Sequence, residues 1–256
     1  MKHYLPILFL LTINACFSQT KLDSLFTQFQ QADLTVVITA KNSIVNYQKE
    51  AIPVLIEMLK DTSYVKLENT ADLIYPGTEK FYGHGWSISY DIDWIAVRAA
   101  WVLEELTFQD FGYSQPAFDF SKINYINVGK DTLGLQNYSK VVDTIEPPTR
   151  AELITKRLML ADSVSQWWEK YKTTWTRFSA LKTALAGTNK RSQELALEYL
   201  RFDNTICEGL TLESYKTELE PLVKAIKNSN NSNADQSKYL LEDKEFYWLK
   251  VRKGIR

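Results

Sequence analysis

The stretch 48–112 constrains the fold more than any other part of the chain. A compact apolar helix pattern ends near Asp61, an irregular stretch follows at 62–92, and a second helix pattern covers 93–107. Apolar residues recur in both patterns at the spacing of a helix that buries one face. Two such helices joined by one connection are typical of a helical hairpin, here with an enlarged loop. The stretch therefore predicts an all-α fold.

Similar periodicity predicts helices elsewhere in the chain. The expected ranges are 21–33, 40–60, 150–171, 178–185, 192–202 and 238–251. Pro53 lies inside the second range, where it is expected to bend the helix or to start a new segment. Asp91 or Asp93 is the expected N-cap of the helix at 93–107. A weaker repeat at 219–228 brings the total to about three helix pairs, which is enough for a short solenoid with capped ends.

One region lacks a helical pattern. β-favouring residues at 122–128 and 133–142 flank the turn sequence at 129–132 and predict a small β-hairpin insert. The expected organisation is one domain, 19–256, that consists of N-terminal helix pairs (21–112), the insert (113–148) and C-terminal helices (149–256).

The composition argues against two classes of protein. The net charge is −1, so the chain lacks the basic field with which proteins bind nucleic acid nonspecifically. Glycine occurs only nine times, which disfavours an all-β fold with many tight turns. The apolar share of 45% is ample for a buried core.

The N-terminus has the pattern of an export signal. A short polar start precedes the apolar run 4–13, which is too short to span a bilayer comfortably. Cleavage after 1–18 fits best, and the ending Cys-Phe-Ser-Gln resembles ordinary signal peptides of the Bacteroidetes type. Alternatively, Cys16 becomes a lipidated first residue and the only membrane attachment. Both alternatives predict a periplasmic or secreted protein in which Cys207 has no intramolecular disulfide partner.

Two motifs follow the first helix pair in order. The second helix ends in Leu-Thr-Phe-Gln-Asp-Phe-Gly at 106–112, and the helix at 150–171 ends in Trp-Trp-Glu-Lys at 167–170. With the early Pro53 and the mid-helix Arg98, they resemble the exported bacterial HEAT-like repeat proteins. That resemblance implies an α–α superhelix of HEAT-like helical hairpins, an α-solenoid that binds partners on its surface. It implies no particular activity.

The loop between the paired helices is the main candidate site. Its part 72–94 concentrates aromatic residues, three of the nine glycines and the only histidine beyond the signal segment. Long loops in compact domains are often functional, and aromatic side chains provide large contact areas. The residues expected to bind a ligand or partner are Tyr75, Tyr82, His84, Trp86, Tyr90 and Asp91. The open alternative is that the loop covers one end of the core.

Catalytic groupings are not evident in the sequence. No second histidine accompanies His84, which excludes a histidine-based zinc site within one chain. Asp91 and Asp93 have a spacing that calcium ligands share, but helix capping explains them better. We expect no catalytic residue, no metal and no cofactor. The leading hypothesis is a scaffold that binds a protein or peptide on a concave face or through the loop. The alternative is an envelope enzyme or glycan-binding protein that uses the loop.

Overall fold

The computed structural model describes residues 20–71, 73–78, 86–114, 123–130, 136–142, 149–230 and 232–242. Most of these residues are helical, as the expected all-α class requires. Within the described ranges, no helix combines the length and the apolar character needed to cross a membrane. The signal segment, with Cys16, lies outside the described residues, as do residues 72 and 79–85 of the candidate loop, which include the expected binding residues Tyr82 and His84.

The N-terminal part contains short helices rather than one long one. Residues 20–29 are helical, and they are followed by α2 (Leu34–Val45), the 3₁₀ turn η1 (Gln48–Glu50) and α3 (Ile52–Met58). The continuous helix expected at 40–60 is therefore wrong. Gln48 interrupts it with a backbone φ of 46°. Pro53 lies in the first turn of α3, where a missing N–H leaves no helical bond unmade, so its role as the start of a new segment is confirmed.

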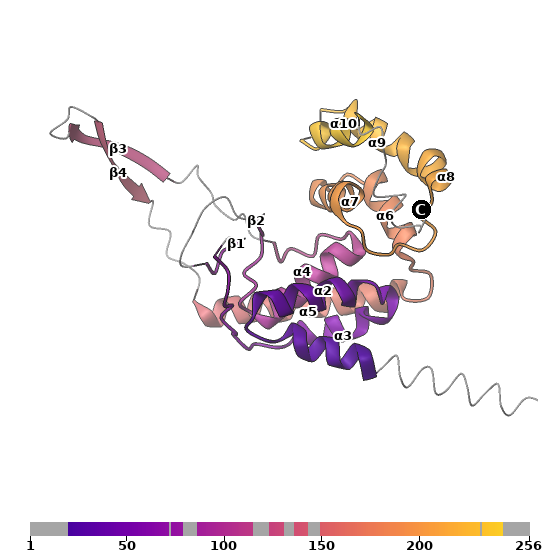
Figure 1. Cartoon of the computed structure of the whole chain (residues 1–256), viewed down its shortest axis with the longest axis horizontal. Coiled ribbons are helices and arrows are strands. Elements are labelled where there is room, and N and C mark those ends of the chain that lie inside the picture. The colour runs from indigo at the N-terminus through magenta and orange to yellow at the C-terminus, as the bar shows by residue number, and fades with distance from the viewer. Residues whose placement is uncertain are drawn as a thin grey trace, which may run out of the picture.

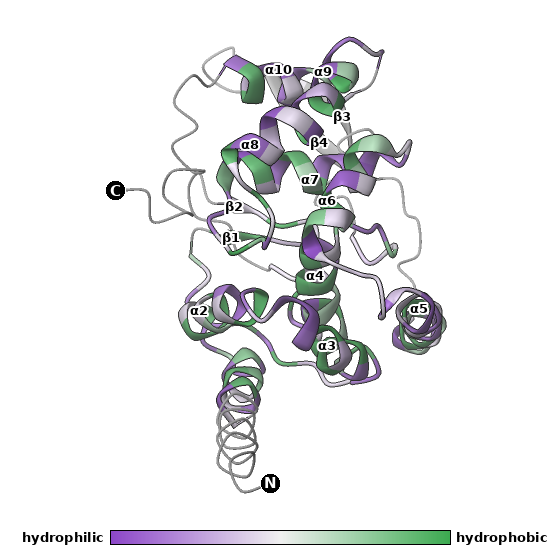
Figure 2. Ribbon diagram, turned by 90° about the vertical axis from the view of Figure 1, so that its right-hand side faces the viewer, coloured by the Kyte–Doolittle hydropathy of each residue, from purple (hydrophilic) through white to green (hydrophobic). Residues whose placement is uncertain are grey.

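Helix α4 (Ile95–Thr107) lies at the centre of the molecule. It contacts α2 and α3 on one side and α6 (Arg177–Ala186) and α7 (Lys190–Phe202) on the other (Figures 1 and 2). Almost all of its residues are buried, including four apolar or small side chains that are fully enclosed (Ala99, Ala100, Val102 and Leu103). Small side chains let neighbouring helices approach α4 closely.

The N-cap expected for α4 is wrong. Trp94 occupies the cap position and no side chain caps the helix. Asp93 is instead fully buried and accepts hydrogen bonds from groups of the preceding loop. Asp93 therefore does not cap α4. Its carboxylate instead accepts hydrogen bonds from the loop and holds the loop against the helix.

The C-terminal part follows the sequence patterns closely. It consists of α5 (Arg150–Tyr171), α6, α7, the single turn α8 (Leu212–Ser214), the π-helical η3 (Tyr215–Leu219), α9 (Glu220–Lys227) and α10 (Ala234–Glu242). Thr149 and Glu152 form a reciprocal capping box at the start of α5. The closing helix starts at Ala234, earlier than expected, and the expected remainder to 251 lies outside the described residues.

Two small strand pairs complete the fold. The strands β1 (Leu73–Ile74) and β2 (Trp86–Ser87) pair in parallel inside the candidate loop. The expected β-hairpin insert is present as the antiparallel pair β3 (Ile123–Lys130) and β4 (Gln136–Val142). Figure 1 shows this hairpin projecting away from the helices. Its register shifts between Asn127 and Gly129, where the glycine has a φ of 124°.

Candidate functional site

Asp93 anchors the candidate loop to the helical core. The hydroxyl of Tyr75 donates to Asp93 Oδ1 at 2.9 Å, and the backbone N–H of Leu67 donates to the same oxygen at 2.8 Å. The hydroxyl of Tyr64 donates to Oδ2 at 3.2 Å, and Lys66 Nζ lies 3.2 Å from it. Tyr75 is only 1% exposed, and burial raises the pKa of its hydroxyl far above the ordinary value. Its ring therefore supports the loop from inside.

Tyr90 fulfils a second internal role. Its buried hydroxyl donates to Glu104 Oε2 at 2.6 Å, while Glu104 Oε1 accepts the backbone N–H groups of Phe111 and Tyr113. Burial raises the pKa of Glu104, and the hydrogen bond from Tyr90 opposes that shift. One carboxylate thus fixes both the end of the candidate loop and the turn after α4.

Arg98 joins the same core from the middle of α4. It is fully buried, and its guanidinium donates to the backbone carbonyls of Phe29, Gln31, Val65 and Ile92. Burial lowers its pKa to about 10, and the charge of Asp93 opposes this shift. The polar position that the sequence placed inside the second helix therefore connects the first helix, the loop and the approach to α4.

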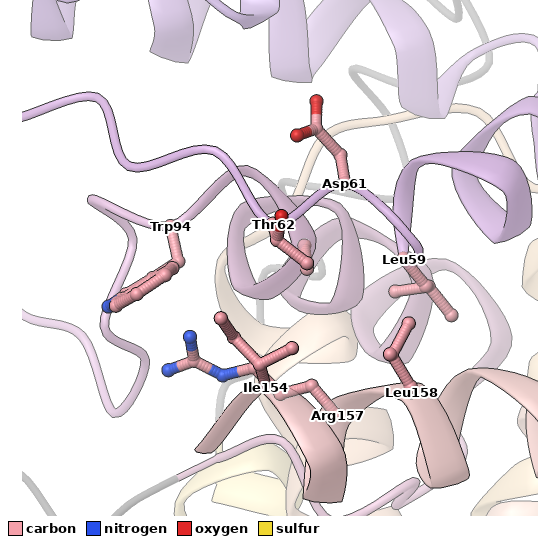
Figure 3. A pocket seen from close by; sticks show the side chains of 8 residues that line it. Leu59, Asp61, Thr62, Trp94, Ile154, Arg157 and Leu158 are labelled. Atoms are coloured by element: carbon pink, nitrogen blue, oxygen red, sulfur yellow. The ribbon is translucent and has the colours of Figure 1, made fainter. Parts of the chain in front are cut away.

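Asp91 lies near Arg157, a residue that borders a small cavity. Its Oδ1 has no hydrogen-bond partner among the described residues, and burial raises the pKa of its carboxyl while nearby Arg157 opposes the shift. The Arg157 guanidinium lies 4.5 Å from the centre of the Trp94 ring. Figure 3 shows Arg157 and Trp94 at the cavity that separates α5 from the end of α3. The cavity measures about 10 Å³, room for roughly one water molecule.

The described part of the loop is thus mainly a cover on the core. Tyr75 and Tyr90, two of the expected binding residues, direct their polar atoms inward. Trp86 is different, because 77% of it is exposed. Among the described members of the expected set, it is the one whose side chain is largely open to solvent and free to contact another molecule.

A second surface lies where α4 and α7 meet. We call it the α4–α7 face, and its members are Lys41, Glu105, Arg191, Glu194, Glu198 and Arg201. Lys41 Nζ and Glu105 Oε2 are 2.5 Å apart, and Lys41 lies 4.4 Å from the centre of the Trp101 ring. Arg191 pairs with Glu194 at 2.7 Å and donates to the Tyr90 hydroxyl at 3.3 Å. The face therefore rests on the residues that hold the loop.

Glu198 stands apart from its neighbours on this face. Among the residues that the structure describes, it makes no hydrogen bond and no ion pair. Although Glu198 is an exposed residue, the surrounding protein partly dehydrates its carboxyl and, with the adjacent charge of Glu194, raises its pKa to about 7. At neutral pH the Glu198 carboxyl is therefore divided between its charged and protonated forms, because the positive charges of Arg191 and Arg201 only partly offset its dehydration and the repulsion from Glu194.

Exposed aromatic side chains lie at one end of the face. Phe202 is 72% exposed and Tyr239 is 58% exposed. The Arg201 guanidinium lies 4.5 Å from the Phe202 ring centre and 5.4 Å from that of Tyr239. Arginine and aromatic side chains are enriched where proteins contact each other.

This face was not predicted from the sequence, although the sequence contains a signal for it. Arg191, Glu194, Glu198 and Arg201 recur at helical spacing along the range that became α7. Such a charged stripe is usually a solvated surface. The contact with α4, which brings Glu105 near Glu198, depends on tertiary structure.

Comparisons with known proteins add no identity. No protein-family model, no curated protein and no solved structure matches the chain. The two motifs that carry the family resemblance do meet in space, since the Phe111 and Trp167 rings are 5.2 Å apart in an edge-to-face arrangement. The described residues also contain no group of three or more side chains suited to hold a metal ion.

Proposed function

We propose that this protein is an exported scaffold that binds a protein or peptide on the α4–α7 face. The observation that carries the proposal is Glu198, whose carboxyl makes no ion pair with described residues, while Lys41 and Arg191 each pair with another glutamate. A lysine or arginine of the partner would supply the direct ion pair that Arg191 and Arg201 do not make with it. Phe202 and Tyr239 would add apolar contact area at the edge.

The finer description of the fold belongs to the same proposal. The contacts of α4 with α3 and of α6 with α7 have the form of successive helix pairs. We interpret them as a short α-solenoid of HEAT-like hairpins, in which α4 and α7 contribute to a shared partner surface.

The direct test is a charge reversal at Glu198. Partner capture by the tagged full chain, with cross-linking in its own envelope, is compared among the unaltered protein, Glu198→Lys and Glu57→Lys. Glu57 is an exposed glutamate of α3 that pairs with Lys60, so it provides the same charge change at another place. We expect capture to fall about tenfold or more for Glu198→Lys only, because an attraction becomes a repulsion.

A reciprocal exchange distinguishes contact from misfolding. Once a captured partner is identified, replacing its cross-linked lysine or arginine with glutamate is expected to restore binding to Glu198→Lys. Equal capture by all three forms of this chain would refute the α4–α7 face as the binding surface.

Glycan binding is the second candidate, and the exposure of Trp86 favours it. An exposed indole provides a flat apolar surface against which a sugar ring packs. The expected observation is binding to an envelope glycan preparation that Trp86→Ala abolishes and Glu198→Lys leaves unchanged.

A further inference from the structure

A separate groove lies between the α2–α3 connection and the start of α6. It measures about 610 Å³, within the range of small-ligand sites. Tyr47 lines one wall, Trp175 and Phe178 line the other, and Glu50 and Glu208 also border it. Its aromatic lining suits an apolar or aromatic ligand body.

Two buried side chains of this groove retain unused hydrogen-bond donors. Trp175 is 7% exposed, and the part of the chain that the structure describes offers no acceptor to its indole N–H. Arg177 is 1% exposed, and its Nη1 donates to Thr205 Oγ1 and the Ile206 carbonyl. Its Nε and Nη2 make no hydrogen bond to described residues, and Nη2 is 3.9 Å from Asp203. Buried donors without acceptors are rare because each is costly.

Both donors lie at the start of helix α6, where the local charge is positive. Trp175 and Arg177 flank Thr176, the N-cap of the ten-residue helix α6. The first turn of a helix carries partial positive charge, which adds to the guanidinium charge that Asp203 offsets only from 3.9 Å and favours an anionic group. A carboxylate is well suited, since its two oxygens accept from planar N–H donors in pairs.

The acidic border restricts which anions fit. Glu50 and Glu208 outnumber Lys49, which also lines the groove, and the excess negative charge at the border opposes ligands with two or more negative charges. We propose that the groove binds an organic monocarboxylate with an apolar or aromatic body. The carboxylate reaches Trp175 and Arg177, and the body packs between Tyr47 and Phe178. Both a free small molecule and the C-terminus of a peptide have this chemistry.

The indole N–H of Trp175 provides a local readout. The full ¹⁵N-labelled chain has seven tryptophans, and comparison with Trp175→Phe identifies the indole signal of Trp175. N-acetyl-phenylalanine is the probe, its uncharged amide is the matched control, and the peptide Ala-Ala-Phe distinguishes a peptide terminus from a free small molecule. Inorganic phosphate tests whether the groove rejects anions with more than one negative charge.

We expect N-acetyl-phenylalanine to shift the Trp175 signal and its amide and phosphate to leave it unchanged. Calorimetry is expected to give a dissociation constant at least about tenfold weaker for Trp175→Phe, because a hydrogen bond to a charged group is lost. Trp86→Phe, the same change on the candidate loop, and Glu198→Lys should bind the probe normally. Equal binding of acid and amide, normal binding by Trp175→Phe, or binding of neither carboxylate would overturn the proposal.

Discussion

The candidate loop and the α4–α7 face differ in whether their charged side chains are buried and hydrogen-bonded. In the network that holds the loop on the core, Asp93 and the α4 residues Arg98 and Glu104 are fully buried and have several hydrogen-bond partners each. On the face, Glu198 is exposed and has none among the described residues. A buried charge must be paired to be tolerated, whereas an exposed one can remain available to a partner. The difference indicates that the loop mainly stabilises the fold and the face is suited to recognition.

The largest expected effect comes from breaking the centre of the loop network. Arg98→Leu should reduce the free energy of unfolding by about 3–5 kcal/mol, because four backbone carbonyls lose their donor and Asp93 loses a nearby positive charge. Urea unfolding followed by circular dichroism measures the change. Arg201→Leu, on the face, should lower stability by less than about 1 kcal/mol. Similar losses for both would contradict the division between the regions.

Removing the hydroxyl group of Tyr90 or of Tyr75 compares how much each tyrosine contributes to the free energy of unfolding. Tyr90→Phe should cost about 2 kcal/mol, because Glu104 Oε2 then loses its donor inside the core. Tyr75→Phe should cost about 1 kcal/mol, since Asp93 Oδ1 still accepts from Leu67. Thermal unfolding of both variants checks the order. If neither changes the melting temperature, the described loop residues do not anchor the core, and their expected binding role gains weight.

The helices and the β-hairpin could be predicted from the sequence better than the hydrogen-bond partners of the polar side chains. The 22-residue helix α5 and the hairpin insert follow from periodicity and capping, which are local properties. Asp93 fitted the pattern of an N-cap equally well, but donors from Tyr75 and Leu67, far from it in sequence, decide its role. The break at Gln48 also lacked a local signal, because a positive φ is rarely expected outside glycine.

A smaller effect of opposite sign is expected on the face. The pKa of Glu198 is raised to about 7 in the folded protein, above its ordinary value, so the folded state binds a proton more readily than the unfolded chain. The free energy of unfolding therefore falls as the pH rises from the ordinary pKa of a glutamate to about 7. Glu198→Gln should stabilise the protein at pH 8 by about 1 kcal/mol after allowance for solvent screening, or about 2–4 °C.

At pH 4, where the carboxyl is largely protonated in both states, most of this gain should be lost. Calorimetric melting at the two pH values measures it, with Glu57→Gln as the control from an exposed ion pair. A gain that is the same at both pH values would mean that the charge of Glu198 is already compensated.

Trp86→Ala is expected to have the smallest effect on stability, within about 0.5 kcal/mol, because most of its ring is in solvent. This makes it the cleanest probe of the loop, whereas alanine at Tyr90 would also remove a core hydrogen bond. If partner capture persists in Trp86→Ala and fails in Glu198→Lys, recognition lies on the α4–α7 face. If capture instead fails in Trp86→Ala while the melting temperature is unchanged, the exposed part of the loop binds the partner. The buried residues of the loop would then stabilise the fold and its exposed residues would bind the partner. The division between stabilising and binding residues would fall inside the loop, not between the loop and the α4–α7 face.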